Sequence, residues 1–204
     1  MKSLLLVGGG GHCHSCIDVI ESTKTYEIEG VVELTASSEL VIGYPVIGSN
    51  NDLPQLIKNS KLALITVGQI KTPNPRIKLF NLLKQLGAEL PIVVSPKAHI
   101  SKHSFIDEGS IVMHGAIVNS SVQIGRNCIV NSQSLLEHGV KVDDHCHIST
   151  GALVNGDVTI GRGSFVGSGA VIKEGVRVGD NVIIGAGQVV LRDVPNDAVV
   201  KICQ

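Results

Sequence analysis

The sequence predicts a fold in two parts, a small α/β unit over residues 1–95 and an all-β parallel β-helix over residues 96–204. In the first part, short apolar runs alternate with helix-like stretches, which is typical of a parallel sheet with crossover helices. In the second part, an aliphatic residue recurs at every sixth position, a spacing that neither an α-helix nor an ordinary strand produces. Aromatic residues make up only 2% of the chain, so we expect closely spaced backbone layers packed through small aliphatic side chains.

The elements of the first part follow from its apolar runs and its helix signals. Gly87 directly follows one helix-like stretch, as is common at a helix C-terminus. Because strand and helix alternate, the elements predict a small, Rossmann-like parallel sheet. The expected strands are 4–7, 28–32, 62–67 and 92–94, and the expected helices are 12–23, 53–57 and 75–86.

Four consecutive glycines, Gly8 to Gly11, follow the first expected strand. A dinucleotide-binding fingerprint requires G-x-G-x-x-G, and Cys13 occupies the third glycine position. The run therefore favours a tight turn whose N–H groups, at a helix N-terminus, are open to an anion or a hydroxyl, over an NAD site. Cys13 and Cys16 have the spacing of half a zinc site, but no second pair follows nearby, so we predict no metal.

The bulk composition excludes several classes of protein. The formal net charge is −1, which argues against nucleic-acid binding because phosphate contacts require a concentrated basic face. The sequence holds no run of about 18 apolar residues, so we expect no membrane span. The first strand is too short for a signal peptide, which predicts a cytoplasmic location. Five cysteines at irregular spacing suit reduced thiols better than a disulfide framework.

The period of six continues over sixteen positions without an insertion. A triangular coil with three short faces explains it, because each face then points one aliphatic residue inward and stacked coils bury a continuous column. Ser, Ala, Cys or Val lies four residues after each position until Gln188, and a glycine often follows directly, which we expect to serve the turn. The positions are Ile100, Ile106, Val112, Val118, Ile124, Val130, Leu136, Val142, Ile148, Val154, Ile160, Val166, Ile172, Val178, Ile184 and Val190.

Two of these hexapeptides, at residues 160–165 and 178–183, resemble those of the left-handed β-helix acyltransferases. With the glycine run before His12 and with Glu137-His138 inside the repeats, nearly the full chain is similar to the sugar acetyltransferase subfamily. That subfamily includes the bacillosamine-pathway and perosamine N-acetyltransferases and the sialic acid O-acetyltransferases. The resemblance implies a left-handed coil, a homotrimer with active sites between neighbouring β-helices, acetyl-CoA as donor and a nucleotide-linked sugar as acceptor.

His138 is the candidate general base. It lies two residues after the inward Leu136, in a turn, and residues 132–138 resemble the family segment that ends in the catalytic histidine. Histidine suits the role because it exchanges protons near neutral pH. Many relatives carry an acid directly after this histidine, where the chain has Gly139. Glu137, Asp143, Asp144 or a main-chain carbonyl is then the alternative orienting partner, and a glutamate at position 139 is expected to accelerate the reaction near neutral pH.

The resemblance also implies the binding residues for both substrates. His147 matches a histidine that contacts acetyl-CoA, and Gly156 matches a position whose N–H faces the thioester oxygen. Two further coenzyme contacts fall on Ser168 and Ala186, largely through the main chain. On the acceptor side, residues of the 1–95 domain match the sugar-nucleotide turn, a carboxylate at the end of the second strand and a contact at the end of the third. These are Gly10, Gly11, His12, Glu33 and Gly68.

Three functions remain open on the sequence. N-acetylation of a nucleotide-linked amino sugar leads, followed by O-acetylation of a sialic-acid-type sugar, because one histidine base serves an amine and a hydroxyl alike. A non-catalytic trimeric scaffold is the third, since Gly139 departs from the family pattern. The chain also ends at Gln204, where relatives often continue into a segment over the coenzyme, which implies a shorter lid or a different grip.

Overall fold

The structure is a computed structural model that describes residues 1–34 and 40–201. The chain divides into two compact units, residues 1–68 with 74–93 and residues 69–73 with 94–204. The sequence predicts one boundary near residue 95 and gives no sign that 69–73 groups with the second unit. Among the described residues, no helix is both long and apolar enough to cross a membrane.

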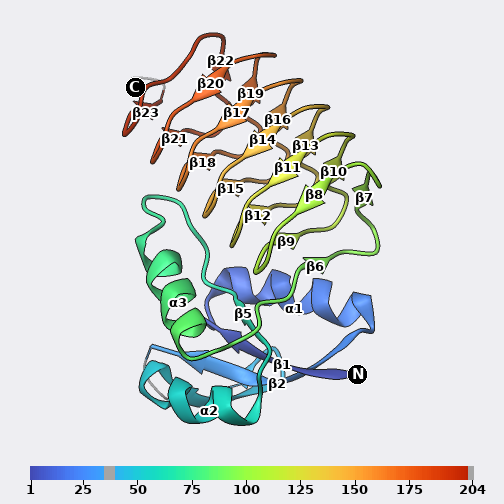
Figure 1. The fold of residues 1–204 in the computed structure, drawn as a ribbon, viewed down its shortest axis with the longest axis vertical. Helices are drawn as coiled ribbons and strands as arrows, with labels where there is room; N and C mark the ends of the chain where they lie inside the picture. The colour runs from blue at the N-terminus through green and yellow to red at the C-terminus, as the bar shows by residue number, and fades with distance from the viewer. Residues whose placement is uncertain (35–39, 202–204) are drawn as a thin grey trace. The chain divides into compact units, whose positions relative to one another are not determined.

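The first unit holds a sheet in the order β3-β4-β2-β1-β5, in which β1 pairs in parallel with β2 and β5 (Figure 1). The three predicted helices and the first three predicted strands are confirmed, each with shifts at its ends. β3 and β4 were missed, because 44–49 mixes proline, glycine and serine with its apolar residues. The strands are β1 Lys2–Val7, β2 Tyr26–Glu33, β3 Leu40–Val41, β4 Tyr44–Ser49 and β5 Ala63–Ile65, and the helices are α1 Gly11–Thr23, the 3-10 turn η1 Asn50–Asp52, α2 Leu53–Asn59 and α3 Asn74–Gln85.

The end of β5 is held by a buried charge. Arg76, on α3, has no solvent exposure, and its guanidinium donates to the carbonyls of Ile65 and Val67 at 3.0 and 2.7 Å. Ile65 is the last residue of β5 that pairs with β1, and Val67 lies beyond it, so the guanidinium binds the main chain where the pairing ends. Apolar residues of α3, Phe80 and Leu83 among them, complete the core against the sheet. Arg76 therefore holds the first residues of the loop that follows β5.

The second unit is a left-handed parallel β-helix of two-residue strands, stacked into three flat sheets (Figure 1). Paired strands lie 18 residues apart along most of the coil, so one coil consists of three hexapeptides. The predicted strand at 92–94 forms as β6, but it pairs with β9 and begins the β-helix; its assignment to the α/β sheet was wrong. The short apolar run alone does not specify its partner.

The three sheets are named here by their end strands. The β7–β22 sheet consists of β7 His99–Ile100, β10 Ile117–Val118, β13 Leu135–Leu136, β16 Leu153–Val154, β19 Val171–Ile172 and β22 Val189–Val190. The β8–β20 sheet consists of β8 Phe105–Ile106, β11 Gln123–Ile124, β14 Lys141–Val142, β17 Thr159–Ile160 and β20 Arg177–Val178. The β6–β23 sheet consists of β6 Val93–Val94, β9 Ile111–Val112, β12 Ile129–Val130, β15 His147–Ile148, β18 Phe165–Val166, β21 Ile183–Ile184 and β23 Val199–Val200.

The period of six is confirmed as the inward column. The aliphatic positions from Val112 to Val190 are at most 5% exposed, and with the small residues of the corners they form one continuous core. The expected role of the glycines needs correction. From Ile106 to Ile184, the left-handed residue of each corner comes three positions after the inward aliphatic residue, as at Gly139 with a φ of 70°. The glycines that directly follow an inward aliphatic residue are required because the next coil is close. A Cβ on Gly161 would stand 2.6 Å from the Gly179 carbonyl oxygen.

Candidate active site

Three corners of the β-helix, one at each edge where two sheets meet, carry the polar residues of interest. The His138 corner, residues 137–139 with 119–121 and 155–157, lies between the β7–β22 and β8–β20 sheets. The Ser168 corner, residues 167–169 with 149–151 and 185–187, lies at the other edge of the β7–β22 sheet. The Asp144 corner, residues 143–145 with 125–127 and 161–163, closes the triangle.

His138 and Gly156 are in contact on successive coils of the His138 corner. A Cβ added to Gly156 would stand 2.6 Å from Cε1 and 2.7 Å from Nε2 of the His138 ring. The ring is exposed and forms no hydrogen bond within the described residues. The buried Gly156 N–H likewise donates to no acceptor in that part of the chain. The glycine therefore creates the space in which the imidazole lies, beside an amide that is free to donate.

The carboxylates near His138 differ from those expected. Oε2 of Glu137 accepts from the Asn119 amide at 3.0 Å and from the His138 backbone N–H at 3.3 Å, so this side chain braces the turn. A Cβ added to Gly139 would overlap Oδ1 of Asp157, which occupies the space beside that glycine. A glutamate at position 139 would have to displace this carboxylate, and its expected acceleration of the reaction stays a prediction. Asp157 was not singled out, since only the stacking of coils brings it there.

Asp143 and Asp144 lie at the Asp144 corner, across the β8–β20 sheet from His138, so within one chain they do not reach it as orienting partners. Asp144 forms an ion pair with Arg126 at 2.7 Å. Burial alone would raise the pKa of Asp144, but the hydrogen bonds and charge of Arg126 outweigh it and lower that pKa. Burial raises the pKa of Asp143, and the charges of Asp180 and Asp144 add to the effect.

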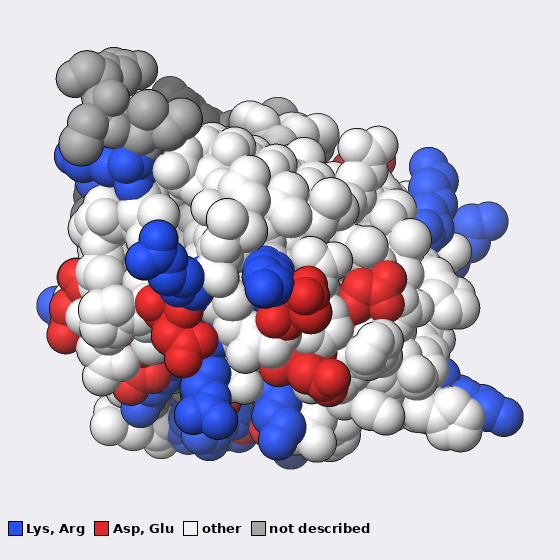
Figure 2. Space-filling view, turned by 90° about the horizontal axis from the view of Figure 1, so that it is seen from above, with Lys and Arg blue, Asp and Glu red and all other residues white. Residues whose placement is uncertain are grey.

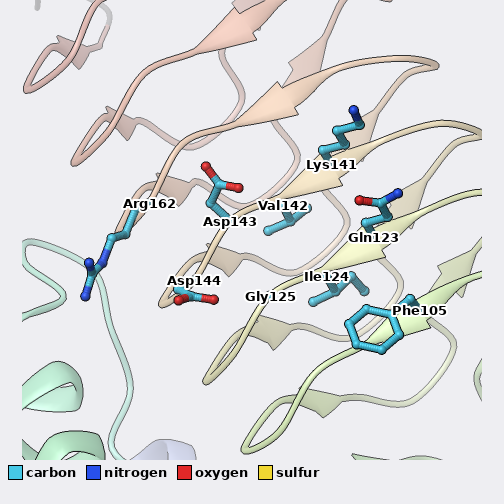
Figure 3. A pocket seen from close by; sticks show the side chains of 9 residues that line it. All are labelled: Phe105, Gln123, Ile124, Gly125, Lys141, Val142, Asp143, Asp144 and Arg162. Carbon is cyan, nitrogen blue, oxygen red and sulfur yellow. The ribbon is translucent and has the colours of Figure 1, made fainter.

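A hollow of about 320 Å³ opens on the outer face of the β8–β20 sheet and reaches the Asp144 corner (Figure 3). Phe105, Gln123 and Lys141 project from three successive strands of the sheet, and Asp143 and Arg162 come from the corner. Of the residues singled out from the sequence for a role in the site, only the alternative orienting partners Asp143 and Asp144 line this hollow. Its mixed charges and exposed phenyl ring offer contacts to a polar ligand, but nothing in its lining resembles a base for acetyl transfer.

His147 points outward from β15 and is only 5% exposed. Its Nδ1 lies 2.6 Å from the carbonyl oxygen of Gln69, which can only accept, so Nδ1 carries the proton. Nε2 then accepts from the Asn131 amide at 3.1 Å, and Phe165 packs its ring edge-to-face at 5.2 Å. Both ring nitrogens are thus engaged within the second unit, and a coenzyme contact of this ring stays a prediction.

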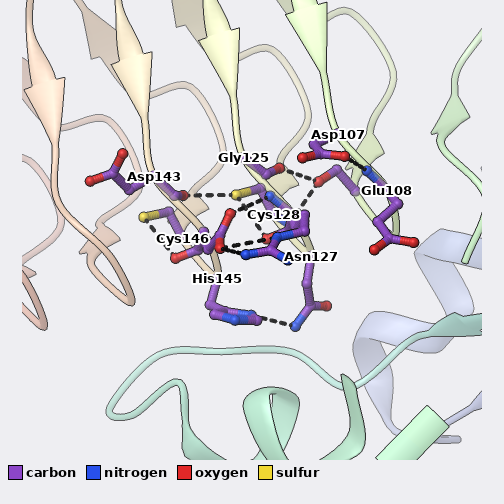
Figure 4. Close-up of polar contacts among 11 residues, drawn as sticks. Asp107, Glu108, Gly125, Asn127, Cys128, Asp143, His145 and Cys146 are labelled. Atoms are coloured by element: carbon purple, nitrogen blue, oxygen red, sulfur yellow. Dashed lines mark hydrogen bonds and ion pairs between the residues drawn. The ribbon is translucent and has the colours of Figure 1, made fainter. Parts of the chain in front are cut away.

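The neighbouring His145 is buried at a left-handed corner position with a φ of 62°. Its Nδ1 lies 2.9 Å from the Asn127 amide one coil below, as Figure 4 shows. The Gln69 amide donates to the His145 carbonyl at 3.0 Å and so joins segment 69–73 to this corner. Neither Gln69 nor Asn127 was predicted, since neither belongs to a motif.

Two buried thiols, Cys128 and Cys146, donate to main-chain carbonyls on the adjacent coil, both at 3.1 Å (Figure 4). Burial raises the pKa of Cys146, which disfavours the thiolate form that a metal would bind. Cys13 and Cys16 are buried free thiols with raised pKa values for the same reason. Over residues 1–34 and 40–201, no group of three potential metal ligands comes together.

Ser168 and Ala186 occupy equivalent positions of adjacent coils in the Ser168 corner. The two coils approach closely, since a Cβ on Gly167 would stand 2.5 Å from the Ala186 nitrogen. The Ser168 hydroxyl lies 2.9 Å from that of Ser149. Because the whole width of the β7–β22 sheet separates this corner from the His138 corner, one chain does not bring Ser168 and Ala186 to His138 and Gly156.

The predicted acceptor residues gather at the carboxyl ends of β1, β2 and β5, where ligands bind in open α/β sheets. The Glu33 side chain covers Gly9, where an added Cβ would overlap its Oε1. His12 packs on Gly68, whose Cβ would stand 3.3 Å from that of His12. Gly10 and Gly11 face open space at the N-terminus of the 13-residue α1, which has no side-chain cap. Free N–H groups at such a terminus attract anions.

Charged groups on the surface are mixed in sign. On the face drawn in Figure 2, the described lysine and arginine side chains are scattered, several of them beside aspartates and glutamates, and do not gather in one basic patch. This distribution matches the formal net charge of −1. It provides little attraction for a polyanion on that face.

The sequence and the structure of the chain match those of known proteins, and these matches identify its family. Residues 3–82 match the PglD N-terminal domain, and residues 157–191 match the bacterial transferase hexapeptide (six repeats). The acetyltransferase domain of PglB from Neisseria gonorrhoeae FA1090, solved with acetyl coenzyme A, is 30% identical with a TM-score of 0.89 over 97% of this chain and 95% of that one. The chain belongs to the hexapeptide-repeat sugar acetyltransferases.

Further solved structures agree with this acetyltransferase fold over nearly the whole chain. Perosamine N-acetyltransferase from Caulobacter crescentus, solved as a histidine-to-asparagine variant with CoA and GDP-perosamine, is 28% identical with a TM-score of 0.93 over 98% of this chain and 93% of that one. WeeI from Acinetobacter baumannii AYE is 25% identical with a TM-score of 0.88 over 98% and 97%. No curated protein sequence gives a significant match. Family membership makes the chain an acetyl-CoA-dependent enzyme.

Proposed function

We propose that this acetyltransferase transfers the acetyl group of acetyl-CoA to the amino group of a nucleotide-linked amino sugar, with His138 as general base. One observation carries the proposal. The exposed His138 ring lies against Gly156 and forms no hydrogen bond within the described residues, so both ring nitrogens are open to substrate. Histidine variants of perosamine N-acetyltransferase have been solved with CoA and GDP-perosamine, which supports an amino-sugar acceptor.

The proposed chemistry is a direct attack. The acceptor nitrogen must lose a proton as it adds to the thioester carbonyl, and the His138 imidazole takes that proton. The carbonyl oxygen gains negative charge at the same step, and a preorganised N–H stabilises it. The Gly156 N–H suits this role because it donates to no other acceptor among the described residues and lies beside the ring. Collapse of the adduct then expels the CoA thiolate.

The acceptor is proposed to bind at the strand ends of the first unit. The uncapped N-terminus of α1, at Gly10 and Gly11, suits the phosphates of a nucleotide-linked sugar. Glu33 accepts hydrogen bonds from hydroxyl groups, while His12 and Gly68 form the opposite wall. This assignment follows the open backbone and the strand-end position rather than any one side chain.

A homotrimer is part of the same proposal. The outer face of the β7–β22 sheet carries a stripe of aliphatic side chains, which a second copy would bury. Its members are Ile117, Leu135, Leu153, Val171 and Val189, with Val189 62% exposed. A heterologous contact, in which different faces of two copies meet, closes into a ring. Such a contact also offers a way to bring the Ser168 corner of one copy to the His138 corner of the next, so that coenzyme and base meet.

The proposal is tested by measuring CoA release with acetyl-CoA and a panel of GDP-, UDP- and dTDP-linked amino sugars and free sialic acids. Release with an amino sugar, with an N-acetyl product by mass spectrometry, is expected. CoA release only with a sialic acid would indicate that the acceptor group is a hydroxyl and not an amine. No CoA release with any acceptor would contradict the proposal. Light scattering that shows a monomer at micromolar concentration would contradict the trimer. A cytoplasmic location stays a prediction, tested by fractionation of cells.

A further inference from the structure

We propose that Asp157, on the coil after His138, positions the His138 ring for proton transfer. The inference rests on the proposed role of His138 as general base. It assigns the orienting carboxylate to a different coil from the base, so that the stacking of the β-helix assembles the pair. Asp157 acts through the histidine and is a positioning residue.

The backbone brings the two residues together. The Asp157 N–H donates to the His138 carbonyl at 2.9 Å, which joins the two coils at this point. The neighbour of Asp157 is Gly156, against which the His138 ring lies. The neighbour of His138 is Gly139, where an added Cβ would overlap Oδ1 of Asp157. The carboxylate therefore fills the space that a side chain next to the base would need, and the glycine leaves that space open.

Neither side chain is committed elsewhere. Within the described residues, the Asp157 carboxylate accepts no hydrogen bond and the His138 ring forms none. Asp157 is held in the left-handed region with a φ of 59°, which aspartate tolerates better than most residues. Two exposed partners of complementary chemistry thus lie on adjacent coils. The proposed pair forms when rotation about the side-chain bonds of His138 presents one ring nitrogen to the carboxylate.

The other charged groups around His138 are accounted for. Glu137, on the same coil, braces the turn through Asn119 and the His138 N–H. The coil below presents only the neutral residues 119–121, and Lys141 points outward from β14 (Figure 3). Glu174 occupies the position of His138 two coils further along the β-helix, with Gly156 on the coil between them. Asp157 is the carboxylate on the coil stacked directly against the base.

A carboxylate improves a histidine base in two ways. It accepts the N–H of one ring nitrogen, which leaves the lone pair of the other directed at the substrate. It also stabilises the imidazolium that forms when the amine proton arrives, while remaining ionised itself. In the acetyltransferase, the proton passes from the acceptor nitrogen to the ring, and Asp157 keeps its charge throughout.

The test begins with Asp157→Asn, which keeps the size of the side chain and suits a left-handed position. We expect kcat to fall roughly tenfold or more with little change in the acetyl-CoA KM. The acid limb of the pH–rate profile should move to lower pH, because a neighbouring carboxylate favours the protonated ring. Asp197→Asn is the matched control, since Asp197 is also left-handed, with a φ of 60°, and accepts from Asn181 in a different corner. It should leave rate and profile unchanged.

An exchange variant separates positioning from stability. Asp157→Gly alone should lose rate like Asp157→Asn, and Gly139→Asp with Asp157→Gly should recover most of it, since the carboxylate then stands on the same coil as the base. Full activity and an unchanged pH profile in Asp157→Asn would overturn the inference, as would an equally slow exchange variant that folds normally. If His138→Ala itself keeps normal turnover, the proposed function fails instead, so the two failures are distinguishable.

Discussion

The α/β unit and the β-helix use their sequences in different ways. In the α/β unit each strand and helix has its own length and partner, and the predicted acceptor residues end three different strands. In the β-helix every coil repeats the same positions, and the proposed site residues His138, Gly156 and Asp157 stand where one coil departs from its neighbours. A repeat thus stacks the same few positions many times, while the non-repeating unit presents a varied surface, to which we assign acceptor binding.

His138→Ala is expected to have the largest effect, and it tests whether the β-helix holds the chemistry. Loss of the base should lower kcat/KM by roughly a hundred- to ten-thousand-fold. The acetyl-CoA dissociation constant should hardly change, because the imidazole acts on the acceptor nitrogen. His103→Ala, at another exposed histidine of the β-helix, is the control. Near-normal turnover would move the base elsewhere, with His145 and His147 next to test.

Ile148→Ala tests how much more stability the β-helix gains from its inward column than from the side chains on its outer faces. Ile148 is fully buried in the inward column, so truncation should cost about 2–5 kcal/mol of stability through lost burial and a cavity. Leu153→Ala, on the outer face of the β7–β22 sheet, starts 39% exposed and should cost less in the isolated chain. Urea denaturation measures both. A larger loss from Leu153→Ala would indicate that this face is buried against another copy.

Gly156→Ala tests the contact between two coils at which the His138 ring lies against Gly156. The added methyl would stand 2.6 Å from the His138 ring, which must move away. Turnover should fall roughly tenfold, as general-base efficiency depends on position, while the Gly156 N–H remains in place. Since Gly156 has no positive φ, the backbone should accept alanine, and the melting temperature should change little. Unchanged turnover would show that the ring position is not critical.

His12→Ala tests the division of labour between the two units. If the α/β unit binds the acceptor, the acceptor KM should rise roughly tenfold, the cost of one lost hydrogen bond or contact of about 1.4 kcal/mol. The acetyl-CoA KM should not follow. His14→Ala, exposed on the same helix α1, is the control. An equal rise in both constants would remove the α/β unit from acceptor recognition.

Arg126→Ala should have the smallest effect. The Arg126–Asp144 pair is partly exposed, with side-chain fractions of 48% and 22%, so its loss should cost about 0.5 kcal/mol. The pKa of Asp144 is lowered in the folded chain, so its contribution is present above the ordinary aspartate pKa and is lost as pH falls through the folded value. Wild type and variant should therefore converge in stability at acid pH. A constant difference at all pH values would assign the loss to packing.

The repeat let the sequence determine the inward column of the β-helix residue by residue, because a single spacing specifies every inward position, whereas the left-handed corner residues were assigned only by the structure. The α/β unit was determined less completely. Its helices and first strands follow from local patterns, but β4 and the true partner of β6 depend on pairings that no local pattern encodes.

Among the candidate site residues, the sequence by itself predicted His138 as the base, which stays a prediction, and the glycine turn before His12 as an open helix N-terminus, which the structure shows. The tertiary structure decided which groups surround them. It separated Asp143 and Asp144 from His138, joined Gln69 to His147, and stacked Asp157 beside Gly139. The physical reason is that residues about 18 positions apart become neighbours only when coils stack, and side-chain contacts between coils depend on space that a linear sequence does not display.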